Sequence, residues 1–146
     1  VQTRGGKAVA LRPAAVVRCE MAEAIVHWVR EDLDGATQEL AGPLAALIVD
    51  TSYECRGRNR VDGARLSEHG LGNAIDLRAI ALADGTLLSL TDLAVAKELR
   101  LRVQGSACAR FTTVLGPGSD AYHATHVHLD LRERRGGYRI CQWDVQ

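Results

Sequence analysis

The feature that most constrains the fold is the strict alternation of polar and apolar residues from His126 to Leu131. A period of two is the pattern of a β-strand with one buried face. Side chains along a strand point in turn to opposite faces, so His126, His128 and Asp130 should share one of them. The apolar residues between them should face the core. The chain is therefore predicted to form a sheet that carries a row of titratable groups away from that core.

A second polar segment lies earlier in the chain and contains His69 and Asp76. Gly70 and Gly72 stand between them. Glycine allows the tight path and positive φ that would bring His69 back beside Asp76. Asp76 itself falls early in a predicted strand, with apolar neighbours on the opposite face. Four of the five histidines of the chain fall in the two polar segments, 67–76 and 123–130.

Histidine and carboxylate side chains from these segments can form a three-ligand zinc site with one open position, which is typical of catalytic rather than structural zinc. The residues alone leave two roles open for His126 and His128. Both can bind the metal, or one can bind it while the other acts on substrate. His27 lies in a predicted helix without a partner motif, so we expect it to be structural. The pattern predicts a metallohydrolase.

Length and composition predict one folded domain over residues 1–146, with residues 1–13 as an N-terminal arm. Apolar residues make up 47% of the chain, which argues against disorder. The 18 basic and 18 acidic residues cancel, so nothing indicates an electrostatic grip on nucleic acid. No stretch approaches the roughly 20 apolar residues of a membrane span. No signal peptide is visible at Val1, and we interpret the sequence as a mature or trimmed form.

The remaining pattern predicts an α+β fold, a small antiparallel sheet flanked by helices. Apolar residues at helical spacing predict a helix around 21–29, and a second helix is expected to be capped by Thr91 and to end at Gly105. Asp84-Gly85 predicts a hairpin turn. The polar stretch 51–73 predicts a long functional loop. Strands are predicted at 45–49, 74–80, 111–115, 126–131 and 138–141.

These residues resemble a known metallopeptidase signature. The LAS superfamily, which includes lysostaphin-type peptidases, D-Ala-D-Ala carboxypeptidases and the hedgehog signalling domain, carries a similar pattern, here Ser67-x-His69-x-x-Gly72-x-Ala74-x-Asp76 followed by His126-x-His128. More narrowly, the segments 52–56, 67–69, 114–118 and 126–130 resemble the bacterial extensin-like C-terminal domain. That resemblance extends over residues 13–141, nearly the whole chain.

The resemblance implies a zinc ion bound by His69, Asp76 and His128. It also implies that His126 is a catalytic histidine rather than a ligand. The spacing His123-x-x-His126-x-His128 is similar to that of penicillin-insensitive murein endopeptidases, in which the first histidine also lines the site.

One departure concerns the general base. The carboxypeptidase branch places an acidic residue three positions before its last zinc ligand, where this chain has Thr125. We therefore expect His126, assisted by His123, to handle the proton. Asp120 and Asp130 are the other candidate bases, and Asp130 is expected instead to orient a histidine.

The function implied by the resemblance is zinc-dependent hydrolysis of peptidoglycan peptides in the periplasm or outside the cell. A D,D-endopeptidase that cuts D-Ala–diaminopimelate links is the first choice. An L,D- or D,D-carboxypeptidase and a non-catalytic, zinc-stabilised cell-wall-binding module are the alternatives. Arg56 is expected to bind a substrate carboxylate, unless it is an ordinary surface arginine. Ser67 is expected to bind substrate or to brace His69.

The four cysteines lack a C-x-x-C pair, which argues against a thiolate zinc site. Their spread suits two disulfides and an oxidising compartment such as a periplasm. Four buried free thiols are the alternative. The sequence alone leaves three pairings open. Family position implies the pairs Cys19–Cys55 and Cys108–Cys141.

Overall fold

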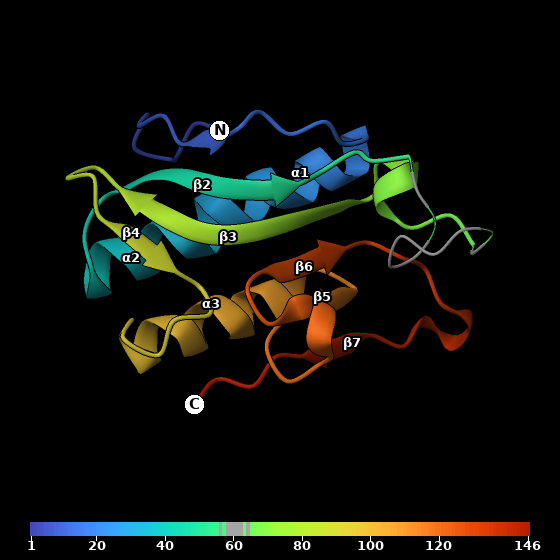
Figure 1. Ribbon diagram of the computed structural model, residues 1–146. Helices are drawn as coiled ribbons and strands as arrows, with labels where there is room; N and C mark the ends of the chain where they lie inside the picture. Colours follow the sequence, from blue (N-terminus) through green and yellow to red (C-terminus); the bar gives the residue numbers. More distant parts are fainter. Residues whose placement is uncertain (56, 58–62, 64) are drawn as a thin grey trace.

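The structure is a computed structural model that describes residues 1–55, 57, 63 and 65–146. As predicted, it has mixed α+β content, with one mostly antiparallel sheet and helices packed against it (Figure 1). The strand order is β1-β2-β3-β6-β5-β7, and β4 pairs with β3 outside this path. The strands are β1 (Ala10–Arg12), β2 (Leu44–Thr51), β3 (Ala74–Leu82), β4 (Leu87–Ser89), β5 (Thr113–Leu115), β6 (Val127–Asp130) and β7 (Ile140–Gln142).

The N-terminal segment packs onto the sheet. β1 pairs in parallel with β2, and Val9 is buried in the core. The first helical region follows as α1 (Cys19–Trp28), the π-helical turn η1 (Val29–Leu33) and α2 (Asp34–Leu40). No helix in the described part of the chain is both long and apolar enough to cross a bilayer.

The second helix expected from the sequence is observed as α3 (Lys97–Arg110), and it differs from the prediction at both ends. Thr91 does not cap it, because the helix begins at Lys97 and Ala96 occupies the N-cap position. Gly105 does not end it. The apolar stripe continues through Val103 to Ala107, both buried, while Gly105 lies exposed. Packing of that stripe outweighs the intrinsic cost of one glycine, about 1 kcal/mol.

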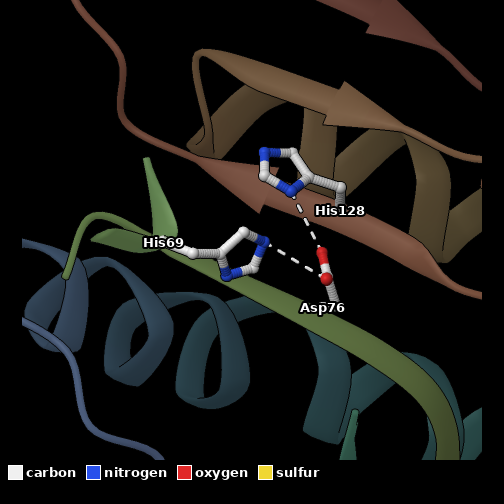
Figure 2. Close-up of side chains that lie close together, drawn as sticks. All are labelled: His69, Asp76 and His128. Carbon is white, nitrogen blue, oxygen red and sulfur yellow. Dashed lines mark hydrogen bonds and ion pairs between the residues drawn. The ribbon is translucent and has the colours of Figure 1, made fainter. Parts of the chain in front are cut away.

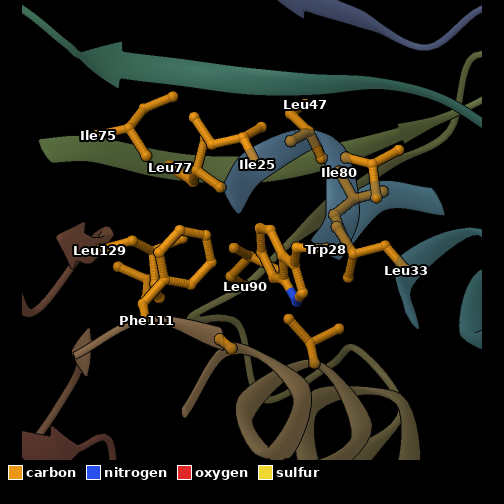
Figure 3. Close-up of a cluster of buried hydrophobic side chains, with 14 of the residues drawn as sticks. Ile25, Trp28, Leu33, Leu47, Ile75, Leu77, Ile80, Leu90, Phe111 and Leu129 are labelled. Atoms are coloured by element: carbon orange, nitrogen blue, oxygen red, sulfur yellow. The ribbon is translucent and has the colours of Figure 1, made fainter. Parts of the chain in front are cut away.

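One apolar core joins the helices to the sheet (Figure 3). Trp28 of α1 and Phe111, just after α3, pack edge to face with their ring centroids 5.5 Å apart. The indole N–H of Trp28 donates to Ser106 Oγ at 2.9 Å, so its polar group is satisfied. The sheet supplies the opposite wall with buried side chains that include Leu47, Ile75, Leu77, Ile80 and Leu129.

The register between β3 and β6 determines which residues point to the face of the sheet opposite the core. Asp76 pairs with His128, and the next position pairs Ile75 with Leu129. Because faces alternate along a strand, burial of Ile75 and Leu129 in the core directs Asp76 and His128 to the other face. As the alternation from His126 predicts, the polar residues of β6 share one face and the apolar residues pack in the core.

One of the two expected disulfides is present. Cys108 near the end of α3 is bonded to Cys141 in the edge strand β7. The expected Cys19–Cys55 bridge is not formed, and this prediction is corrected: both thiols are free and exposed, one at the start of α1 and the other after β2.

Candidate metal centre

Three buried side chains from separate elements converge at the end of the β3–β6 pair (Figure 2). His69 comes from the 3-10 turn η3 (His69–Leu71), Asp76 from β3 and His128 from β6. One ligand atom from each lies within 4.8 Å of the other two. The three residues predicted as ligands are therefore brought together as a group of metal-binding size.

Gly72 closes the turn that positions His69. It is left-handed, with φ of 66°, and its N–H donates to the His69 carbonyl at 3.1 Å. Its own carbonyl accepts from Arg18 N at 2.8 Å, which ties the turn to the start of α1. Gly70 is not left-handed. A Cβ there would lie 2.6 Å from Leu66 Cδ1, so close packing explains this glycine.

Each histidine directs one ring nitrogen to Asp76 and has the other held by an oxygen. His69 Nε2 lies 3.2 Å from Asp76 Oδ2, and Nδ1 donates to the Ser52 carbonyl at 2.7 Å. His128 Nδ1 lies 3.0 Å from Asp76 Oδ1, and Nε2 lies 2.7 Å from Asp130 Oδ2. Oxygens that orient the outer nitrogens are usual for metal-binding histidines.

Asp130 is itself fixed in place. Its Oδ1 accepts from the Arg132 backbone N–H at 2.9 Å. Burial disfavours its ionised form, but bonds from His128 and Thr113 outweigh this and lower the pKa of Asp130. An ionised Asp130 can hold His128 in one orientation, the arrangement expected from the sequence.

The shared carboxylate sets the electrostatics of the centre. Burial would raise the pKa of Asp76, but hydrogen bonds with His128 and His69 hold it well below its usual range. Burial also opposes the charged form of His128, yet hydrogen bonds with Asp130 and Asp76 raise the pKa of His128 to about 9. Asp76 is thus anionic at neutral pH, as a metal ligand would have to be, whereas a metal bound to His128 would have to displace its proton.

Two further histidines adjoin the group. His126 Nε2 lies 3.7 Å from Asp76 Oδ2. Burial is the largest effect on the pKa of His126 and lowers it, as do the nearby His123 and His128. The negative charge of Asp76 acts in the opposite direction, but the net result is a lowered pKa. The His123 ring centroid lies 5.2 Å from that of His126. His126 is therefore close to the centre and mainly neutral at pH 7.

Asp120 holds His123. Its carboxylate accepts from the backbone N–H groups of Tyr122 and His123 at the start of the turn η4 (Ala121–His123). The same Oδ1 lies 2.6 Å from His123 Nδ1. These contacts lower the pKa of Asp120 despite the opposing effect of burial. Asp120 thus fixes the orientation of the His123 ring.

A pocket of about 430 Å³ contains all these groups. Ser67 also lines it, and its hydroxyl accepts from Gly70 N at 3.3 Å, so it braces the turn that carries His69. Arg56, predicted to bind substrate, lies outside the described residues. Pocket residues that the sequence reasoning missed are Thr51, Glu68, Thr113, Leu115, Tyr122, Arg132, Arg134 and Ile140.

A signal for two of these residues was present in the sequence. Every second residue from His126 to Arg134 is polar, and this series includes Arg132 and Arg134, which lie beyond the last residue of β6.

The family model for the C-terminus of extensin-like proteins matches residues 1–142. The chain belongs to this family. The extensin-like domain includes every residue that lines the pocket, since the last of them is Ile140. The narrower resemblance found in the sequence is thereby confirmed. Comparison of this extensin-like chain with curated proteins and with solved structures found no match.

Proposed function

We propose that this extensin-like domain is a zinc-dependent peptidase of the LAS superfamily. Its substrates are peptidoglycan cross-link peptides, and it acts in the periplasm or outside the cell. One observation carries the proposal. His69, Asp76 and His128 form a group of metal-binding size, and two further histidines outside that group line the same pocket.

The three residues fit a zinc ion in both chemistry and orientation. Two imidazole nitrogens and a carboxylate are a donor set found in catalytic zinc centres. The Ser52 carbonyl and Asp130 already orient the two rings. When bound, such an ion supplies Lewis acidity, which activates water and an amide carbonyl for hydrolysis.

His126 is the residue to which we assign proton transfer. It lies beside the centre, and its lowered pKa keeps it neutral near pH 7, so it can accept a proton from water. The same ring can then return the proton to the leaving amine. His123, held by Asp120, adds a second imidazole at the same side of the pocket.

We favour a D,D-endopeptidase that cuts D-Ala–diaminopimelate cross-links. Thr125 stands where the carboxypeptidase branch carries its acidic base, and the pair of histidines supplies an alternative to that acid. The competing candidates are an L,D- or D,D-carboxypeptidase and a non-catalytic, zinc-stabilised cell-wall-binding module. A purely structural zinc site would require neither His126 nor the Asp120–His123 pair.

Digestion of purified sacculi with the zinc-loaded protein tests the proposal, with mass spectrometry of the products. We expect cross-linked muropeptides to be converted to uncross-linked ones. Release of single terminal residues would instead identify a carboxypeptidase. Zinc binding and sacculus binding without any cleavage would identify the binding module and overturn the enzymatic proposal.

A further inference from the structure

One extended segment contributes five residues to the lining of the pocket. His126, His128 and Asp130 lie on it in alternate positions, and Arg132 and Arg134 continue the series. All five line the pocket. The segment past β6 remains extended at Arg134, with φ of −124° and ψ of 147°. The row of polar residues that includes the candidate metal ligand His128 therefore continues to Arg132 and Arg134.

The acidic groups of the pocket already have partners. Asp76 and Asp130 contact His128, and Asp120 contacts His123. Glu68 accepts from Asn73 Nδ2 at 2.7 Å. None of these carboxylates is within ion-pair distance of either arginine.

The arginines lack anionic partners within the described part of the chain. Arg134 donates to neutral groups only, the Thr112 carbonyl at 3.1 Å and Thr113 Oγ1 at 2.6 Å, and lies 5.6 Å from the Tyr138 ring centroid. Arg132 is half-buried as a residue, and its guanidinium has neither a hydrogen bond nor an ion pair to a described residue. The pocket lining thus includes two positive charges that form no ion pair with a described acid.

We propose that Arg132 binds a carboxylate of the peptide substrate and that Arg134 is a positioning residue for it. This inference rests on the proposed peptidase function and adds a specificity determinant to it. A guanidinium matches a carboxylate in shape and can donate two parallel hydrogen bonds. Arg134, anchored on β5, fixes the segment and adds positive potential beside Arg132.

The position of Arg132 limits where that carboxylate lies in the substrate. Arg132 lies four positions after His128, or roughly 13 Å along an extended chain. The same length holds about four residues of an extended peptide, before the reach of the arginine side chain is added or subtracted. The carboxylate is therefore within a few residues of the cleaved bond. Both the C-terminal carboxylate and a side-chain carboxylate of a stem peptide meet this condition.

The test uses the full chain and matched peptides in which one carboxylate at a time is converted to an amide. The variants are Arg132→Gln, Arg132→Lys and, as a control, Arg135→Gln, which removes the same charge from an exposed residue outside the pocket. Binding to the zinc-free protein is measured by calorimetry, and KM and kcat are measured with zinc present.

We expect Arg132→Gln to weaken binding and raise KM roughly 10–100-fold for the acid peptide, the usual worth of hydrogen bonds to a charged group. The change in kcat should be small. The amidated peptide should bind the wild type and Arg132→Gln equally weakly, and Arg132→Lys should restore part of the difference. The carboxylate bound by Arg132 is the one whose conversion to an amide removes the difference in binding between the wild type and Arg132→Gln.

Three results would overturn the inference: equal losses for acid and amide peptides, an equal effect of Arg135→Gln, or no binding of any carboxylate peptide to the wild type. Failure of the wild type to cleave any peptide would overturn the proposed function. The binding measurements on the zinc-free protein would still decide the role of Arg132.

Discussion

Asp76 is the residue on which the candidate centre converges. Both of its oxygens are engaged, one by His69 and one by His128, and His126 lies 3.7 Å away. It lies near the start of β3, where it pairs with both β2 and β6, and it is buried, so its position is fixed by backbone as well as by side-chain contacts. His126 therefore differs from the two candidate ligands, His69 and His128, in lying slightly farther from the same carboxylate.

The first prediction separates His128 from His126. His128→Ala should lose most of the bound zinc, because only two ligands remain. His126→Ala should keep its zinc and its melting temperature, while turnover falls roughly 10²–10⁴-fold, the contribution of one general acid–base group. Elemental analysis, thermal melting and muropeptide cleavage measure the three properties.

His27→Ala is the matched control, since this histidine is exposed and lies on α1. Zinc loss in His126→Ala would make it a ligand. Unchanged cleavage in the same variant would transfer the proton role to His123.

The second prediction concerns pH. In the zinc-free protein the folded-state pKa of His128 is raised from 6.5 to about 9, so the imidazolium stabilises the fold below pH 6.5. That contribution is lost as the pH rises towards 9. Zinc must displace this proton, so its apparent affinity should rise about tenfold per unit over the same range.

Thermal melting from pH 6 to 9, with a chelator or with zinc, measures both trends. The zinc-free protein should become less stable as the pH rises, and the gain in melting temperature on adding zinc should increase. The His128→Ala variant should lose both trends. A gain from zinc that is independent of pH would contradict protonation of His128 in the zinc-free state.

Among the elements, the turn η3 is the one that positions the candidate ligand His69. Gly72→Ala should destabilise the protein by about 1–2 kcal/mol, because φ of 66° is unfavourable for alanine. The new Cβ would also lie 3.3 Å from Arg18 N. Zinc affinity should fall as well, since the turn carries His69. Chemical denaturation and zinc titration give the two values.

Gly105→Ala provides the opposite case at the element scale. Gly105 lies in the interior of α3, is exposed and has no atom within 4 Å of an added Cβ. The substitution should stabilise the protein by about 0.5–1 kcal/mol and leave zinc affinity unchanged. Equal effects of the two substitutions would show that the backbone conformation of Gly72 is not what holds the turn.

Local pattern predicted which face each residue of β6 occupies better than it predicted the ends of the elements. The alternation at His126–Leu131 gave the face of each residue, because a strand has only two faces. The end of α3 could not be predicted in this way, since Gly105 signals a break whose cost is outweighed by tertiary packing. The pairing of Asp76 with His128 was also invisible in spacing alone. It depends on a register between two strands that are far apart in the sequence. The resemblance to a family implied that both residues bind zinc, but it gave no register.

At the scale of the whole molecule, Cys108–Cys141 joins α3 to an edge strand. The two cysteines lie 33 residues apart in sequence, and the chain-entropy relation assigns a loop of this size about 3–4 kcal/mol. Replacing both by alanine should lower the melting temperature by roughly 10 °C for a domain of this length.

Replacement of Cys19 and Cys55 by alanine is the control and should change stability by less than about 0.5 kcal/mol, because both thiols are exposed and unbonded. A loss comparable to that of the first pair would mean that a second bridge forms in solution. Non-reducing peptide mapping of the unmodified protein would then have to show it.

The seam between β3 and β6 has a consequence for how the molecule could be divided. His69 and Asp76 belong to the part of the chain before α3, whereas His128 belongs to the part after it (Figure 1). The two parts are connected along the chain by the exposed stretch around Leu93. A protein cut there would consist of two fragments, each with an incomplete ligand set. If the proposed zinc ion binds, it would act as a chemical inducer of fragment complementation, and the domain could serve as a split reporter of free zinc.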